Sequence, residues 1–132
     1  MPSPTSPALN QQTILELREL DTPQEPSIVD ELAAIFFTTA PEHIALIREA
    51  ATAGRLEPVQ KAAHRLKSIG GNLGAEVFSD YCQTLESLQG ADFGPQALQI
   101  LELLDLELVR VVTELRRDML KTDVTVQPDS MS

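Results

Sequence analysis

The chain is 132 residues long, 42% apolar and only 4% aromatic. This length allows one domain with a single modest core, and aliphatic residues must fill that core, which favours packed helices over a sheet sandwich. The formal net charge is −10, which argues against a protein that binds nucleic acid or an anionic membrane surface.

The cysteine content and the N-terminal stretch exclude further classes of protein. One cysteine, Cys82, excludes an intramolecular disulfide and a thiol-rich metal site. The opening MPSPTSPALN lacks both the basic and the apolar region of a secretory signal. Apolar stretches are shorter than the roughly 20 residues of a membrane helix. We therefore expect a cytoplasmic protein without a metal of its own.

The N-terminal part of the chain predicts a short helix and a longer one. Residues 1–9 are rich in Pro and Ser and are expected to be disordered. Asn10 is predicted to cap a short helix that ends before the turn residues 21–23. Ser27 then begins a second helix, with an acidic residue three positions later as in a capping box.

Proline and glycine mark the next predicted boundaries. Pro41 is expected in the first turn of a separate helix, with His43 as an exposed residue of that turn and Gly54 after its end. Pro58 suits the first turn of the following helix, which Gly74 ends.

Two further helices complete the prediction. An amphipathic helix spans about 77–88, and a long one spans about 95–120 with apolar residues at three- and four-residue spacing. Residues 122–132 are polar and are expected to form a disordered tail. Since no alternating strand pattern occurs, residues 10–121 predict an all-α fold, an antiparallel four-helix bundle with one or two additional N-terminal helices.

His64 is predicted to face solvent from the helix that contains AAHRLKSIGGNLGA, residues 62–75. Each residue turns a helix by about 100°, so His64 lies about 160° from the inward-facing Leu66. Lys67 reaches the same patch of surface, and Ser68 and Gly71 keep the backbone low beyond the ring.

The surface around this histidine is basic and rich in glycine. Residues 55–68 hold four basic residues against one acidic residue. Each interior glycine costs around 1 kcal/mol relative to alanine, so Gly70 and Gly71 predict a flat surface for a partner. The alternative is a solvated helix face with chance charges. The basic residues are Arg55, Lys61, Arg65 and Lys67.

The chemistry open to His64 is limited. A neutral exposed imidazole is nucleophilic near neutral pH, but no acidic residue lies within helical reach on its own face, so a hydrolytic triad is not expected. Cys82 falls on an inward stripe and is predicted to be core. Without a phosphate-binding loop or dinucleotide fingerprint, no nucleotide cofactor is expected. His64 with Lys67 suits phosphoryl transfer, in which a partner supplies the metal and the activated phosphoryl group.

The sequence resembles the histidine-containing phosphotransfer (HPt) domain family of multistep two-component phosphorelays. The resemblance covers about residues 10–120 and rests on His64 with Leu-Lys-Ser beginning two residues after it, on Asn-Leu-Gly-Ala at 72–75, and on Cys-x-x-Leu-Glu at 82–86. The family often has glycine where Ser68 stands here.

The resemblance implies a phosphocarrier rather than an enzyme. His64 would be phosphorylated on Nε2 by the aspartyl phosphate of a receiver domain and would pass the group to another receiver. Lys67 would help to hold the phosphoryl group, while Gly71 and Gly74 would give the receiver room to approach. The full predicted docking set is Gln60, Lys61, Arg65, Ser68, Gly71 and Gly74.

Receiver domains of response regulators and a hybrid sensor kinase are the implied partners, with Mg²⁺ expected in the partner receiver. Two alternatives share this fold. One is a non-phosphorylated scaffold that binds receivers, and the other is the phospho-accepting domain of a chemotaxis-type histidine kinase. A monomer is expected, because one bundle of this size can stand alone.

Overall fold

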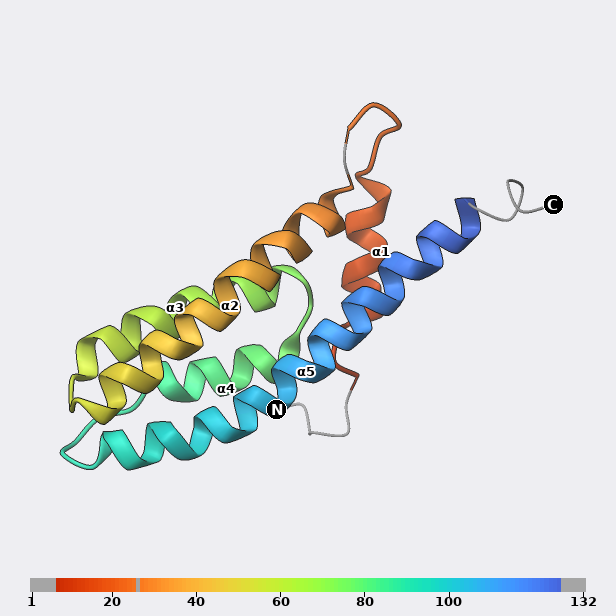
Figure 1. The fold of residues 1–132 in the computed structure, drawn as a ribbon. Helices are drawn as coiled ribbons and strands as arrows, with labels where there is room; N and C mark the ends of the chain where they lie inside the picture. Colours follow the sequence, from red (N-terminus) through yellow and green to blue (C-terminus); the bar gives the residue numbers. More distant parts are fainter. Residues whose placement is uncertain (1–6, 26, 127–132) are drawn as a thin grey trace.

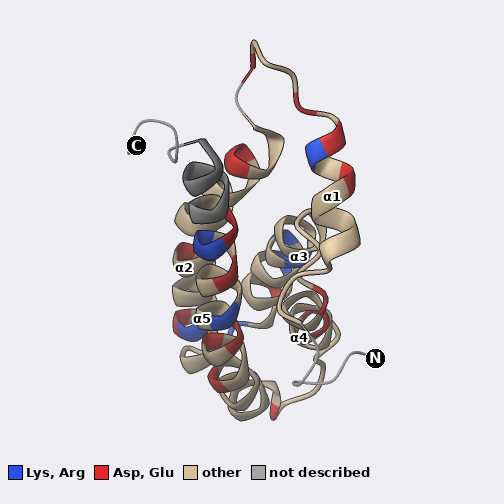
Figure 2. Ribbon diagram, turned by 90° about the vertical axis from the view of Figure 1, so that its right-hand side faces the viewer, with Lys and Arg blue, Asp and Glu red and all other residues tan. Residues whose placement is uncertain are grey.

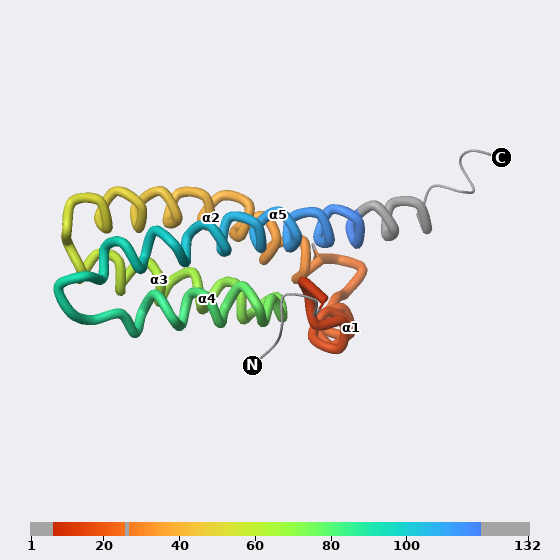
Figure 3. Tube along the Cα trace, turned by 90° about the horizontal axis from the view of Figure 1, so that it is seen from below, coloured from red at the N-terminus to blue at the C-terminus, as the bar shows by residue number. Residues whose placement is uncertain are grey.

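The computed structural model describes residues 7–25 and 27–126. All regular secondary structure in these residues is helical. Helices α2 to α5 form an antiparallel bundle in which α2 and α4 each pack against both α3 and α5 (Figure 1). Helix α1 lies across one end of this bundle (Figure 3). The predicted all-α bundle with an additional N-terminal helix is confirmed. The helices are α1 (Gln11–Glu19), α2 (Ile28–Thr52), α3 (Leu56–Asn72), α4 (Glu76–Glu86) and α5 (Phe93–Val126).

The core is built from the apolar stripe of each helix. Buried residues recur at three- and four-residue spacing, which turns one face of every bundle helix inward. Phe36 from α2 and Phe78 from α4 meet edge to face, with 5.1 Å between ring centroids. Cys82 is fully buried, as predicted, and burial raises the pKa of its thiol. Among the described residues, no helix is long and apolar enough to cross a membrane.

The predicted helix break at Pro41 is wrong. Pro41 lies inside α2, which is one continuous helix, although an interior proline removes a backbone hydrogen bond and costs about 3 kcal/mol in an unsupported helix. Ala40 and Ile44 on either side of it are buried, so core packing holds both halves in line. His43 is therefore a half-buried residue of mid-α2, not a first-turn residue, and its Nδ1 lies 3.1 Å from the carbonyl oxygen of Thr39.

The N-terminal segment packs against the bundle instead of lying free. Ala8 and Leu9 are buried, whereas the sequence predicted them to be disordered. Asn10 caps α1 as predicted, and its side chain accepts hydrogen bonds from two backbone N–H groups of the first turn. The backbone N–H of Asn10 donates to the carbonyl oxygen of Gly74 at 2.8 Å. This bond ties the segment to the turn between α3 and α4.

The last helix is longer than expected. Helix α5 continues to Val126, past the predicted end near residue 120 and into the segment predicted to be a disordered tail. The rest of that predicted tail, 127–132, and residues 1–6 lie outside the described residues.

One charged side chain is buried in the described part of the chain, that of Glu107 on α5. Its Oε1 accepts a hydrogen bond from Nη1 of Arg110 at 2.7 Å, while its Oε2 is buried without a hydrogen-bond partner. Burial raises the pKa of this carboxyl group, because the loss of hydration outweighs the attraction of Arg110.

We predict that Glu107→Gln stabilises the protein above mildly acidic pH. A carboxyl group whose pKa rises on folding weakens the folded state once pH exceeds its ordinary value of 4.5, and the penalty grows until pH passes the folded-state pKa. Glutamine removes the charge and keeps an oxygen for Arg110. Thermal melts at about pH 4, 6 and 8 should show little gain at the lowest pH and the largest gain at the highest. A variant that melts lower than wild type at the highest pH would contradict this.

Candidate functional site

His64 stands on the outer face of α3, as its spacing predicts. Its side chain is 62% exposed, whereas Ala63 and Leu66 beside it are fully buried. Helix α3 begins at Leu56 with Pro58 in its first turn, where a proline loses no helical hydrogen bond. The apolar stripe of α3 therefore fixes which way the imidazole points.

A carboxylate from the neighbouring helix completes the site. Oε2 of Glu86 on α4 lies 2.6 Å from Nδ1 of His64, and Oε1 of the same group accepts from Nζ of Lys67, also at 2.6 Å. Lys67 donates a further hydrogen bond to Oε1 of Gln83 at 2.9 Å. Glu86 thus joins the two α3 residues that the sequence singled out.

Glu86 is the site residue that sequence reasoning missed. Helical spacing identifies neighbours on the same helix only, and α3 indeed offers no acidic partner there. The available signal was the Cys-x-x-Leu-Glu run. Its residues Cys82 and Leu85 are buried, so the next residue, Glu86, lies at the edge of the buried face of α4, within reach of α3.

The charge on Glu86 decides which ring nitrogen is available. The pKa of Glu86 is lowered, chiefly by the hydrogen bond from Lys67 and also by that from His64, so the carboxylate is ionised at neutral pH. An ionised carboxylate only accepts hydrogen bonds, so Nδ1 of a neutral His64 carries the proton. Nε2 of this tautomer then holds the lone pair, which is what a nucleophilic nitrogen needs.

Four of the predicted docking residues are exposed on α3 around the histidine. Lys61 and Arg65 lie on the surface one turn apart, and Gly71 is exposed near the end of the helix. Ser68 is exposed too, and its Oγ donates to the carbonyl oxygen of His64 at 3.3 Å.

The other two predicted docking residues have structural roles. Nε2 of Gln60 donates to the carbonyl oxygen of Leu88 at 3.1 Å, which ties α3 to the end of α4. Gly74 is buried and has φ +74°, and a Cβ there would lie 2.9 Å from Cβ of Thr13. It therefore ends α3 beneath α1, as its predicted position suggested, but a partner cannot reach it.

Gly70 and Gly71 differ in role, although the sequence predicted one flat surface from both. A Cβ on Gly70 would lie 2.8 Å from Cδ1 of Phe78, so this glycine lets α3 and α4 approach closely. A Cβ on Gly71 would meet only Oγ of Ser79, at an ordinary 3.8 Å. Of the two glycines, only Gly71 leaves the helix surface without a side chain on the side exposed to solvent.

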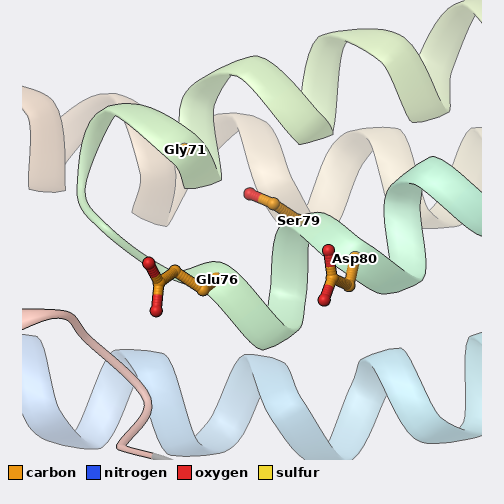
Figure 4. A pocket seen from close by; sticks show the side chains of 4 residues that line it. All are labelled: Gly71, Glu76, Ser79 and Asp80. Atoms are coloured by element: carbon orange, nitrogen blue, oxygen red, sulfur yellow. The ribbon is translucent and has the colours of Figure 1, made fainter. Parts of the chain in front are cut away.

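A shallow acidic cleft lies beyond Gly71, between α3 and α4 (Figure 4). It has a volume of about 440 Å³, and its side chains come from α4. Glu76 accepts a hydrogen bond from Nδ2 of Asn10 at 3.2 Å, and Oδ2 of Asp80 is buried without a hydrogen-bond partner. The lining residues are Gly71, Glu76, Ser79 and Asp80.

The family follows from comparison with known proteins. The sequence model of the Hpt domain matches residues 31–118. The chain belongs to the Hpt domain family. Hpt domains are phosphocarrier intermediates rather than classical enzymes. The fold is similar to that of histidine-containing phosphotransfer protein B (HptB) from Pseudomonas aeruginosa PAO1, with a TM-score of 0.72 and 23% identity, over 89% of this chain and 98% of that chain. A search of curated proteins found no match.

We predict opposite effects of alanine at the two neighbouring glycines. Gly70→Ala should destabilise this Hpt domain by about 1–3 kcal/mol, because the new methyl group overlaps Phe78. Gly71→Ala should be neutral or stabilising by up to about 1 kcal/mol, because alanine is the better helix former. Urea unfolding followed by circular dichroism measures both, and equal effects of the two substitutions would contradict the assignment.

Proposed function

We propose that this Hpt domain carries a phosphoryl group on His64, taking it from the aspartyl phosphate of one receiver domain and passing it to another. A single observation carries the proposal: an exposed imidazole whose Nδ1 is held by Glu86, so that Nε2 keeps its lone pair toward solvent. The proposed partners are a hybrid sensor kinase and response regulators, and the proposed setting is a cytoplasmic monomer.

The transfer step needs no group on this chain that donates or removes a proton. The Nε2 lone pair attacks phosphorus, the N–P bond forms, and the P–O bond to the aspartyl carboxylate breaks with that carboxylate as the leaving group. The proton on Nδ1 stays in its hydrogen bond to Glu86. Mg²⁺ in the partner receiver would neutralise the moving charge, and the reverse step loads the next receiver.

Lys67 is suited to a change of partner during this step. In the unphosphorylated protein its ammonium group is bound to Glu86 and Gln83 rather than to the ring. A phosphoryl group brings roughly two negative charges and strong acceptor oxygens. We expect Lys67 to turn from Glu86 toward these oxygens, while Glu86 keeps its hydrogen bond to Nδ1.

The first test is phosphate labelling. A ³²P-labelled receiver domain is expected to transfer label to the wild-type protein and to His43→Gln, but not to His64→Gln. The product should be acid-labile and base-stable, as an N-linked phosphate is. His43 is the matched control because it is the only other histidine. Labelling of His64→Gln, or no labelling of wild type by any receiver tried, would refute the proposal.

The donor separates the proposal from its closest alternative. A phospho-accepting domain of a chemotaxis-type kinase would be labelled by ATP and a kinase core with no receiver present. The proposed phosphocarrier takes its phosphoryl group from a receiver, so label from ATP and a kinase core in the absence of a receiver would favour the alternative.

The second prediction concerns Glu86. Glu86→Ala should slow transfer to His64 by about tenfold or more, because the ring loses its fixed tautomer and orientation. Glu86→Gln keeps an acceptor for Nδ1 and should fall between alanine and wild type. Nitrogen-15 NMR of His64 should show the proton on Nδ1 in wild type and a mixture of tautomers in Glu86→Ala. Glu102→Ala, an exposed change on α5, is the control, and an unchanged tautomer in Glu86→Ala would count against this role.

A further inference from the structure

The surfaces on the two sides of His64 differ in chemistry. Toward α4 lie Glu86 and the acidic cleft that contains Glu76 and Asp80. Toward α2 lies a shallow groove between α2 and α3 with a volume of about 280 Å³. The residues that line this second surface, which we call the α2–α3 groove, are His43, Leu46, Pro58, Lys61 and Ala62.

The α2–α3 groove is apolar and open. Leu46 is 51% exposed at its edge, which is a high exposure for so large an apolar side chain. Lys61 lines the groove and also stands one turn before His64 on α3, so the groove is continuous with the face of the phosphoacceptor. A partner bound in a single position can therefore contact both Nε2 of His64 and this groove.

Positive charge lies on the same flank of α3. Arg65 follows Lys61 by one helical turn, and both side chains are exposed. The ion pair between Lys61 and Glu57 joins two groups that are each about three-quarters exposed, so it holds the lysine only weakly. On the opposite flank Lys67 is already bound by Glu86. Figure 2 shows basic residues on α3 and acidic residues on α4.

The charge of the partner selects between the two sides. A receiver domain that holds Mg²⁺ and an aspartyl phosphate must present carboxylates and a phosphoryl group at its reacting surface. Such a surface is repelled by the carboxylates of Glu76 and Asp80 and attracted by Lys61 and Arg65.

We infer that the receiver domain docks over the α2–α3 groove, with an apolar side chain of the receiver against Leu46 and its acidic reacting surface beside Lys61 and Arg65. This inference rests on the proposed phosphocarrier function. It adds the side from which the partner approaches and the residues that recognise it.

The test compares two leucines of similar exposure on different helices. The probe is the Mg²⁺-loaded receiver domain that transfers fastest to wild type in the labelling assay. Leu46→Glu should lower the second-order rate of transfer by at least about tenfold, as loss of an apolar anchor does. Leu103→Glu on α5 is the matched control, because Leu103 is 47% exposed, and its rate should stay within about twofold of wild type.

Charge reversals test the orientation. Arg65→Glu should slow transfer and weaken its dependence on salt, because an attractive contact with the acidic receiver is lost. Glu76→Lys on the opposite side should leave the rate unchanged or raise it slightly. If Glu76→Lys slows transfer while Leu46→Glu and Arg65→Glu do not, the receiver lies over α4 and the inference is wrong.

Phosphorylation by a small donor separates this inference from the proposed function. Phosphoramidate needs no docking surface, so it should phosphorylate His64 equally in wild type and Leu46→Glu. Normal labelling by phosphoramidate with slow transfer from the receiver supports the inference. Wild-type rates of transfer from the receiver in Leu46→Glu and Arg65→Glu overturn the inference alone, and failure of wild type to accept phosphate from either donor overturns the proposed function.

Discussion

The carboxylate of Glu86 accepts hydrogen bonds from two residues of another helix, and the chemistry of the site depends on this sharing. One oxygen lies against Nδ1 of His64, and the other accepts a hydrogen bond from Lys67. In the proposed function the first contact leaves Nε2 as the nucleophile, and the second keeps Lys67 near the incoming phosphoryl group. Since the carboxylate belongs to α4 and the other two residues to α3, the site exists only while these helices are packed. The close approach at Gly70 and Phe78 is part of that packing.

The parts of the molecule that follow from local spacing could be predicted from the sequence. The exposure of His64, the burial of Leu66 and the caps at Asn10 and Ser27 each depend on residues within one or two turns. Glu86 could not be found in this way, because its partners are 19 and 22 positions away along the chain. The inward direction of Gly70 follows from its place four residues after Leu66, but its contact with Phe78 does not.

Two other differences between the sequence predictions and the structure arise because tertiary packing outweighs local conformational preference. Pro41 is a local signal for a helix boundary, yet α2 continues through it because the residues on both sides are buried in the same core. Ala8 and Leu9 follow a stretch with the composition of a disordered terminus and are nevertheless buried. Composition describes the average of a segment, whereas burial depends on whether individual side chains, such as those of Ala8 and Leu9, pack against the rest of the protein.

The hydrogen bond from Asn10 to Gly74 has a consequence for where this domain ends. The segment that matches the family model begins at residue 31, but α1 and the residues before it cover the turn that follows the helix of His64. Arg18 on α1 also pairs with Asp118 on α5. The residues that pack together in this domain therefore extend beyond those that the family model matches. A fragment trimmed to the matching segment would leave that turn uncovered, at the end of the helix that carries His64.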